Sequence, residues 1–374
     1  MVKILIAVSG IGLGHVARAR VLAKALASMG ANVELLGPPP IGSYLRSYSM
    51  EPHPVSDMLE PYSPIVDRFY SSTRSGRIGL KMELEEAKVA RKNAEIIEGH
   101  IKLDSYDVVV SDESWELMYM GLDRVSSPKV LVTDFISYPY RRGLIAAIAF
   151  NRFMSSRLSQ FDILAFTGFP QKICAARWPP LVGRRLSEAI YRVEVIGLIP
   201  PALEDEILTP KQALDELGLD EPPILALPGG TKAGHDIIHR AAASLARDGF
   251  KVVTTLPDPP SGAYRVPGEK QYRIPLMMRG FSSAVTLGGL SSLASVASLG
   301  IPALAIPLPG HFEQEENVIL ASRHYRWIRA IPASKAVYAS SLLKDVKKPS
   351  GGDSSIFTSP YKLARLILHL ARGY

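Results

Sequence analysis

A chain of 374 residues exceeds what one hydrophobic core usually organises, so its length predicts two domains. Hydrophobic residues make up 47% of it and charged residues 21%, which excludes disordered and fibrous proteins. A net charge of +7 suits an anionic ligand, but no cationic run interleaved with aromatic residues, zinc-knuckle spacing or helix-turn-helix pattern is present, so we expect no nucleic-acid partner.

The first half of the chain alternates short apolar segments with helical ones. The expected strands are Val2 to Val8, Asn32 to Leu36, Asp107 to Val110, Lys129 to Thr133 and Asp162 to Phe166, and a helix is expected from Val16 to Met29. Continuous apolar strands of this kind occur in parallel sheets that carry helices on both faces. The first half is therefore predicted to be a doubly wound α/β domain, which is a Rossmann-like architecture.

The second half repeats this rhythm after a change in composition. A Gly- and Pro-containing stretch, the acidic run Glu204 to Glu206 and Pro222-Pro223 indicate a linker. The next expected strands are Ile224 to Leu227, Lys251 to Leu256, Ser283 to Leu287, Ala303 to Ile306 and Trp327 to Ile331, and an amphipathic helix follows from Tyr361 to Leu370. The predicted division is a first domain over 1–200, a linker over 201–222, a second Rossmann-like domain over 223–357, and a helix over 358–374 that crosses back to the first domain. Two such sheets are expected to face a cleft.

A glycine-rich turn connects the first expected strand to the first expected helix. Gly10, Gly12 and Gly14 alternate there, which lets backbone approach a ligand closely, and His15 begins the helix. The spacing differs from the dinucleotide pattern, so a nicotinamide cofactor is not expected. We expect the positive helix end to hold His15 near neutral, as a general base requires. The alternatives are a structural turn and a packed or solvated histidine.

A carboxylate follows the buried strand that ends at Val110. Asp112 is expected at the same sheet edge as His15, where it would fix the imidazole tautomer and stabilise its positive charge. The alternative is a carboxylate that ends a strand in a turn or caps a helix. Glu113 is the substitute for Asp112 in this role.

The first strand of the second half also runs into a glycine-rich turn. The turn from Gly229 to Gly234 combines small residues with the Thr231 hydroxyl and the Lys232 cation. Backbone amides at a helix start, together with a hydroxyl donor, suit a diphosphate. The order of residues is not that of a Walker loop, and a purely structural turn is the alternative.

The most specific pattern runs from Gly288-Gly289-Leu290-Ser291-Ser292, through Gly300-Ile301-Pro302, to Ile306-Pro307-Leu308-Pro309-Gly310-His311-Phe312-Glu313-Gln314-Glu315-Glu316-Asn317. It resembles the donor-binding signature of GT-B nucleotide-sugar glycosyltransferases, particularly those related to the bacterial N-acetylglucosaminyltransferase that makes lipid II (glycosyltransferase family 28-like). The loop with His15, the turn from Gly229 to Gly234 and Val195 to Pro200 match the family in order and placement. The resemblance covers effectively the whole chain.

The resemblance implies roles for the donor-binding residues. The donor site would comprise the turn residues Gly12 and Gly14, the diphosphate-binding residues Gly230, Thr231, Gly289 and Ser291 or Ser292, and the sugar-contacting residues Glu313, Gln314 and Asn317. The histidine of the N-terminal domain is the base in this family, which assigns that role to His15. The chain departs from the family at Ser295, where relatives usually have a ribose-binding glutamate. This departure puts donor affinity and nucleotide identity in doubt.

A membrane contact is suggested by the segment 141–157. Arg141 and Arg142 precede an apolar run from Leu144 to Phe150, and Arg152 and Arg157 follow it. Such a basic-edged helix suits an anionic membrane surface, and a lipid-linked acceptor would fit it. The alternative is that the apolar stripe packs into the core.

The remaining expectations concern location and cofactors. The single cysteine, Cys174, excludes an intramolecular disulfide, and no signal-peptide pattern opens the sequence. We therefore expect a cytoplasmic protein, at the inner face of the membrane where the segment 141–157 makes contact. The histidines show no metal-ligand spacing beside an acidic partner, so neither a metal nor a cofactor is expected.

Together these patterns predict an inverting glycosyltransferase of the hexosyltransferase type. His15, oriented by Asp112, would deprotonate an acceptor hydroxyl, and the best guess for the donor is UDP-N-acetylglucosamine. Two alternatives remain open. One is a UDP-N-acetylglucosamine 2-epimerase of the non-NAD type, and the other is a non-catalytic GT-B subunit that binds a partner, which the Ser295 departure keeps open.

Overall fold

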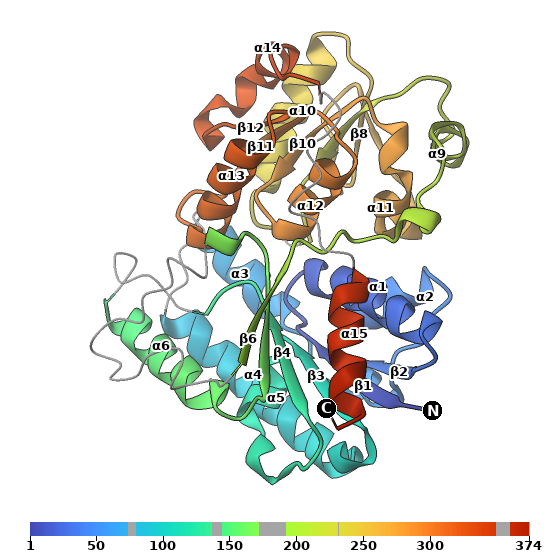
Figure 1. Cartoon of the computed structure of the whole chain (residues 1–374). Helices are drawn as coiled ribbons and strands as arrows, with labels where there is room; N and C mark the ends of the chain where they lie inside the picture. Colours follow the sequence, from blue (N-terminus) through green and yellow to red (C-terminus); the bar gives the residue numbers. More distant parts are fainter. Residues whose placement is uncertain (74–79, 137–143, 172–191, 231, 349–359, 374) are drawn as a thin grey trace. The chain divides into compact units, whose positions relative to one another are not determined.

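The computed structural model describes residues 1–73, 80–136, 144–171, 192–230, 232–348 and 360–373. Within these ranges the chain divides into two compact units. The first contains the described residues of 1–66, 80–199 and 360–373, and the second contains 67–73 and the described residues of 200–348. Each unit is built on its own six-stranded parallel sheet (Figure 1).

The first sheet has the strand order β2-β1-β3-β4-β5-β6. Its strands are β1 (Lys3–Val8), β2 (Asn32–Leu36), β3 (Val108–Asp112), β4 (Lys129–Thr133), β5 (Ile163–Thr167) and β6 (Arg192–Gly197). The helices of this half are α1 (Gly14–Ser28), α2 (Ile41–Arg46), α3 (Ser63–Thr73), α4 (Leu80–His100), α5 (Trp115–Tyr119) and α6 (Leu144–Leu158). The order reverses direction between β1 and β3, and ligands of open α/β sheets bind beyond the carboxyl ends of strands at such a point.

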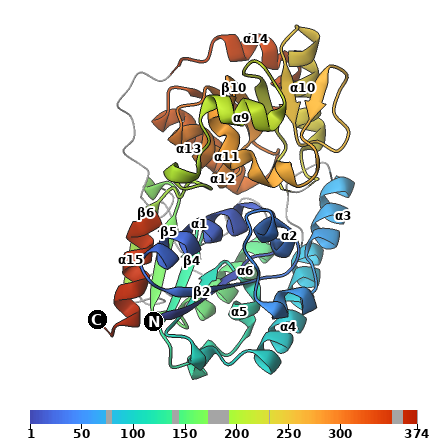
Figure 2. The ribbon, with the colours of Figure 1, turned by 90° about the vertical axis from the view of Figure 1, so that its right-hand side faces the viewer.

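Helix α1 is buried on nearly all sides, which requires a cover on the face turned away from the sheet. Even its two arginines are almost inaccessible, at 5% for Arg18 and 0% for Arg20. The cover is the C-terminal helix α15 (Pro360–Ala371), which packs against α1 within the first unit (Figure 1). The Lys362 ammonium group donates a hydrogen bond to the carbonyl of Val195 in β6, 2.9 Å away, and Figure 2 shows α15 beside this strand.

The opposite face of the first sheet carries a hydrophobic core. Residues of α4, α5 and α6 pack there on side chains from β1, β3, β4 and β5. Trp115, Phe150 and Phe153 form an aromatic group at its margin, with ring centroids 6.0 Å apart for the Trp115 and Phe150 pair. The helices on both faces explain why all the residues of β3, β4 and β5 are buried.

The second sheet has the order β12-β11-β10-β7-β8-β9. Its strands are β7 (Ile224–Leu227), β8 (Val252–Thr254), β9 (Ala263–Arg265), β10 (Ser283–Leu287), β11 (Ala303–Ile306) and β12 (Ile328–Ala330). The helices of this half are α9 (Pro210–Leu217), α10 (His235–Arg247), α11 (Ile274–Met277), α12 (Leu290–Ser298), α13 (Phe312–His324) and α14 (Ala339–Lys344). This is the Rossmann strand order, with its switch point between β7 and β10.

The residues expected to form a linker are ordered. Helix α9 begins with a capping box, in which the Thr209 hydroxyl accepts from the Gln212 amide at 3.3 Å and the Gln212 side chain accepts from the Thr209 amide at 3.0 Å. It ends at Gly218, whose φ of +68° lies in the left-handed region that suits glycine. Within the second unit, the Leu208 amide donates to the carbonyl of Leu276, so this segment packs with that unit.

Candidate active site

His15 lies at the switch point of the first sheet. Strand β1 ends at Val8, which is in register with Asp112 at the end of β3, and the Ser9 amide donates a 2.9 Å hydrogen bond to the carbonyl of Asp112. The turn then passes through Gly12, whose φ of +75° favours glycine, and α1 begins at Gly14. His15, in the first turn of α1, is thereby placed over the carboxyl end of β3.

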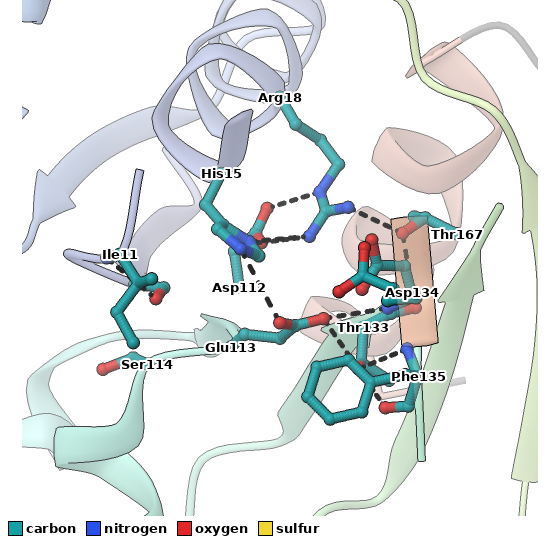
Figure 3. Close-up of polar contacts among 12 residues, drawn as sticks. Ile11, His15, Arg18, Asp112, Glu113, Ser114, Thr133, Asp134, Phe135 and Thr167 are labelled. Carbon is teal, nitrogen blue, oxygen red and sulfur yellow. Dashed lines mark hydrogen bonds and ion pairs between the residues drawn. The ribbon is translucent and has the colours of Figure 1, made fainter. Parts of the chain in front are cut away.

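The imidazole of His15 is held by a buried carboxylate and a buried guanidinium group (Figure 3). Its Nδ1 lies 3.0 Å from Oδ1 of Asp112, whose side chain is completely buried. Arg18, one turn further along α1, donates from Nε to the other oxygen of Asp112 at 2.9 Å, and its Nη2 donates to Oδ1. The guanidinium and the imidazole therefore share one carboxylate, which fixes both side chains.

Glu113 faces the other ring nitrogen. Its Oε2 lies 3.7 Å from Nε2 of His15 (Figure 3). Its Oε1 accepts a 2.9 Å hydrogen bond from the amide of Asp134 and lies 2.8 Å from the hydroxyl of Thr133. The Glu113 side chain is only 6% exposed, so a second buried carboxyl group lies on the opposite side of the imidazole from Asp112.

Polar residues at the ends of the next two strands extend the cluster. Arg18 donates from Nη1 to the hydroxyl of Thr167 at the end of β5, 2.8 Å away. Asp134 directly follows β4 and is 5% exposed. The carboxyl ends of three neighbouring strands, β3, β4 and β5, thus supply one network around His15, as Figure 3 shows.

The charges of this network set the protonation of its members. Burial alone would lower the pKa of His15, but Glu113 and the hydrogen bond to Asp112 outweigh it and raise the pKa to about 9. Burial would raise the pKa of Asp112, but the charge and hydrogen bonds of Arg18 hold it below the ordinary value. The expectation of a near-neutral histidine is therefore wrong, because two carboxyl groups outweigh the helix end.

The protonated imidazole should stabilise the fold in a pH-dependent way. Because the pKa of His15 rises from 6.5 to about 9 on folding, this contribution is fully present below pH 6.5 and lost as the pH rises through about 9. The rise corresponds to on the order of 3 kcal/mol. We expect His15→Gln to lower the free energy of unfolding by this order at about pH 6, and by far less at about pH 10. Denaturant unfolding of both proteins at the two pH values measures it, and a difference that does not shrink with pH would contradict the assignment.

The two glycine-rich turns of the second unit meet at its switch point. Strands β7 and β10 are parallel neighbours, with Leu227 in register with Thr286. The turn after β7 lies against Leu287, the last residue of β10, because a Cβ added at Gly234 would come within 2.8 Å of the Leu287 side chain. Gly230 is exposed in this turn, whereas Thr231 falls outside the described residues. The predicted diphosphate-binding turns are therefore adjacent.

Gly288 and Gly289 follow β10 and differ in their surroundings. A Cβ at Gly288 would meet the Val318 side chain at 2.7 Å and the backbone oxygen of Gln314 at 2.8 Å, so this glycine is required for close packing on α13. A Cβ at Gly289 would meet nothing within 4 Å, and its φ of −65° suits any residue. Gly289 therefore leaves open space where α12 begins, and the partly exposed Ser291 and Ser292 lie in the first turn of that helix.

The start of α13 organises the loop before it. Gln314 accepts a 3.0 Å hydrogen bond from the Leu308 amide. Asn317 is completely buried, and its amide nitrogen lies 3.2 Å from Glu313 Oε1 and 3.5 Å from the carbonyl of Gly288. Asn317 therefore supports the loop that contains Gly288, whereas Glu313 and Gln314 are partly exposed.

The residue at which the chain departs from the family pattern faces its own helix. Ser295 lies within α12, is 6% exposed, and donates from its hydroxyl to the carbonyl of Ser291 at 3.0 Å. A serine that bonds one turn back along its helix is a local arrangement. In this conformation its hydroxyl proton is used within α12.

Several members of the His15 network were not identified from the sequence, although signals for them exist. Arg18 lies three residues after His15, which puts both on one helical face. Asp134 and Thr167 stand at the ends of buried strands, as Asp112 does. The reasoning that selected Asp112 applies equally to these positions.

The described part of the segment 141–157, residues 144–157, lies within α6. Met154 and Leu158 are buried in the core of the first unit, with Phe150 and Phe153 packed against it, while Ile145 is 74% exposed. Arg141 and Arg142 fall outside the described residues. None of the helices in the described ranges is both long and apolar enough to cross a membrane. Among the described residues, no group of three or more His, Cys, Asp or Glu side chains is arranged so that it could hold a metal ion.

Comparisons with known proteins address the fold. No protein-family model and no curated protein sequence matches the chain. Among solved structures, the glycosyltransferase SnogD from Streptomyces nogalater matches with a TM-score of 0.59 and 13% identity, covering 99% of both chains. The Streptomyces sp. SF2575 glycosyltransferase SsfS6, complexed with thymidine diphosphate, matches with a TM-score of 0.58 and 13% identity, covering 100% of this chain and 96% of SsfS6. Arabidopsis thaliana UGT89C1, complexed with UDP, matches with a TM-score of 0.58 and 13% identity. This match covers 99% of this chain and 100% of UGT89C1.

These matches span both sheets of the chain. At 13% identity the likeness concerns the fold, and it agrees with two parallel six-stranded sheets flanked by helices. The predicted fold class is confirmed: this chain has the GT-B fold found in these glycosyltransferases.

Proposed function

We propose that the chain is an inverting glycosyltransferase that uses a nucleoside diphosphate sugar as donor. The observation that carries this proposal is the imidazole of His15, fixed by Asp112 at the switch point of the first sheet. Adjacent glycine-rich turns at the switch point of the second sheet support it. SsfS6 and UGT89C1, which share the fold, are complexed with thymidine diphosphate and UDP.

The proposed mechanism assigns a role to each end of the imidazole. With a proton on Nδ1, the imidazole donates a hydrogen bond to Asp112. Nε2 is then the ring nitrogen that accepts the proton of the acceptor hydroxyl. The deprotonated oxygen attacks the anomeric carbon, and the bond from that carbon to the diphosphate breaks on the opposite side. Backbone amides at the Gly230 and Gly289 turns, with Thr231 and Ser291 or Ser292, stabilise the departing diphosphate.

Donor and acceptor are proposed more narrowly from the resemblance of the sequence. We propose UDP-N-acetylglucosamine as donor, with Glu313, Gln314 and Asn317 around the transferred sugar, and a lipid-linked acceptor. The exposed Ile145 and Arg152 of α6 support a membrane contact, whereas the packing of Phe150 and Phe153 supports a role in the core. An epimerase of the non-NAD type would release a free sugar or nucleotide without an acceptor, so analysis of the products separates the two activities.

Gly289 provides a direct test of the donor site. We expect Gly289→Leu to fold, because a Cβ there meets nothing within 4 Å, and to lose UDP binding, because its side chain enters the space assigned to the diphosphate. Ligand at 100 times its Kd stabilises a protein by about 2.7 kcal/mol, so saturating UDP should raise the melting temperature of the wild type and not of the variant.

The matched control is Gly121→Leu. Gly121 also has open space around its Cβ but lies in the first unit, before the short helix Leu122–Arg124. UDP should stabilise this variant as it does the wild type. Equal stabilisation of Gly289→Leu by UDP would remove the loop after β10 from the donor site.

A further inference from the structure

Both ring nitrogens of His15 face a carboxyl group. Nδ1 is 3.0 Å from Asp112 and Nε2 is 3.7 Å from Glu113. Under the proposed function, on which this inference rests, Nε2 takes the acceptor proton. Glu113 therefore lies on the reactive side of the imidazole. Asp112 orients the ring through Nδ1, so Glu113 is not needed for that orientation.

The backbone holds Glu113 in this position. Its φ of +50° is uncommon for a residue with a side chain and costs on the order of 1 kcal/mol. The neighbouring strands maintain it, because the Glu113 amide donates to the carbonyl of Val132 at 3.2 Å and Glu113 forms an isolated bridge with Val8. An unfavourable conformation held from two strands aims the carboxyl group at the imidazole.

Both carboxyl oxygens of Glu113 lie among polar groups: its side chain also hydrogen-bonds to the Asp134 side chain, and Oε2 is the oxygen that lies 3.7 Å from Nε2 of His15. Oε1 accepts from the Asp134 amide and lies within hydrogen-bonding distance of the Thr133 hydroxyl. Oε2 is then the oxygen that exchanges a proton with Nε2. The 3.7 Å separation exceeds a direct hydrogen bond, and small adjustments of either side chain close it, as in other catalytic pairs that tighten when substrate binds.

The surrounding charges make a shared proton favourable. The groups around the pair are Arg18 on α1, Asp112 on β3 and Asp134 after β4. With His15 protonated, two cations meet three carboxyl groups, so the cluster is neutral when one carboxyl group keeps its proton. Burial and Asp134 raise the pKa of Glu113 above its ordinary value, which places that proton on Glu113.

We propose that Glu113 and His15 form a proton-sharing pair, in which Glu113 is a positioning residue that sets whether Nε2 is free to accept the acceptor proton. The pair loses one proton to solvent, and the remaining proton rests on Nε2 of His15, beside the Glu113 carboxylate, until it passes to Oε2 as the acceptor hydroxyl approaches. Nε2 then takes the proton of the acceptor hydroxyl while the new glycosidic bond forms and the bond to the diphosphate breaks. The imidazolium finally releases its proton to solvent, so the balance is one proton per transfer.

The test is Glu113→Gln in the full chain. Glutamine keeps an oxygen for Asp134 and Thr133 but removes the titrating carboxyl group. An NMR titration of the His15 ring, assigned by the loss of its signals in His15→Gln, should change from a coupled titration to a single step, with its pKa lowered by at least ~1 pH unit. An unchanged pKa would overturn the proposal.

The matched control is Glu116→Gln. Glu116 is also a buried glutamate near the end of β3, but it bonds to the hydroxyls of Tyr62 and Ser114, both at 2.8 Å. This variant should leave the His15 titration unchanged. A second measurement uses the wild type alone: both ring nitrogens should be protonated at about pH 7.5, and a neutral ring there would overturn the proposal even if Glu113→Gln fails to fold.

Kinetics separate this inference from the proposed function. The pH profile of kcat/KM for UDP-N-acetylglucosamine turnover should move to lower pH in Glu113→Gln, in step with the NMR pKa. A lowered NMR pKa without turnover by either protein would leave the proton-sharing pair standing and remove sugar transfer. Turnover with an unmoved pH profile would remove the role of Glu113 instead.

Discussion

Replacing His15 by alanine is expected to lower kcat for UDP release from UDP-N-acetylglucosamine by ~10²- to 10⁴-fold, the usual contribution of a positioned general base. The reason is the geometry at the first sheet edge, where Asp112 fixes the ring through Nδ1 and leaves Nε2 to accept a proton. The loss should appear in kcat whether water or an alcohol attacks, because both nucleophiles give up a proton.

Donor binding separates a catalytic loss from a general one. His15 lies in the first unit and the predicted diphosphate turns lie in the second, so His15→Ala should keep the UDP-induced rise in melting temperature. The control is His100→Ala, because His100 is exposed at the end of α4. Turnover by His15→Ala at the wild-type rate would show that another group is the base.

The sequence predicts all the interior strands of the two described sheets, and the edge strands β2 and β12 as well. Segments such as Lys129–Thr133 and Ala303–Ile306 are apolar along their length because helices cover both faces, and their bounds agree with the predicted ones. The strands that were not predicted lie at sheet edges. In β6 the sequence Arg192-Val193-Glu194 is partly exposed, and β9 has only three residues, so neither shows a continuous apolar run.

The candidate site was predictable in its position and not in its charge state. His15 and Asp112 are close because strand β1, which precedes His15, and strand β3, which contains Asp112, end side by side in the sheet. The order of strands and helices along the chain is enough to predict that these two strand ends are neighbours. The protonation of His15 depends on Glu113, whose approach to Nε2 requires a positive φ after β3. A single non-glycine residue in that region has no sequence signature, so the second carboxyl group could only be found in three dimensions.

Loss of Arg18 is expected to destabilise the first unit strongly. Arg18 donates to both oxygens of Asp112, and the two side chains are 6% and 0% exposed. Arg18→Met keeps the length of the side chain but leaves a buried carboxylate without its main partner, which typically costs about 3–5 kcal/mol. Denaturant unfolding near neutral pH measures the difference from the wild type.

Two further results would assign this cost to Asp112. The double variant Arg18→Met/Asp112→Asn should recover most of the lost stability, because it removes the stranded charge. The Arg18→Met deficit should also shrink as the pH falls below about 3.8, the ordinary pKa of an aspartate, because the depressed pKa of Asp112 gives stability that is present above this pH and lost below it.

The matched control is Arg20→Met on the same helix. Arg20 is completely buried, and its guanidinium carbon lies 4.0 Å from the centroid of the Tyr48 ring. Its loss should lower stability through packing and cation–π contact, and adding Asp112→Asn should not restore it. If Asp112→Asn restored the stability of both arginine variants equally, the effect of losing Arg18 would be one of packing. If it restores the stability of Arg18→Met alone, the Asp112 carboxylate is the group that Arg18 neutralises next to His15.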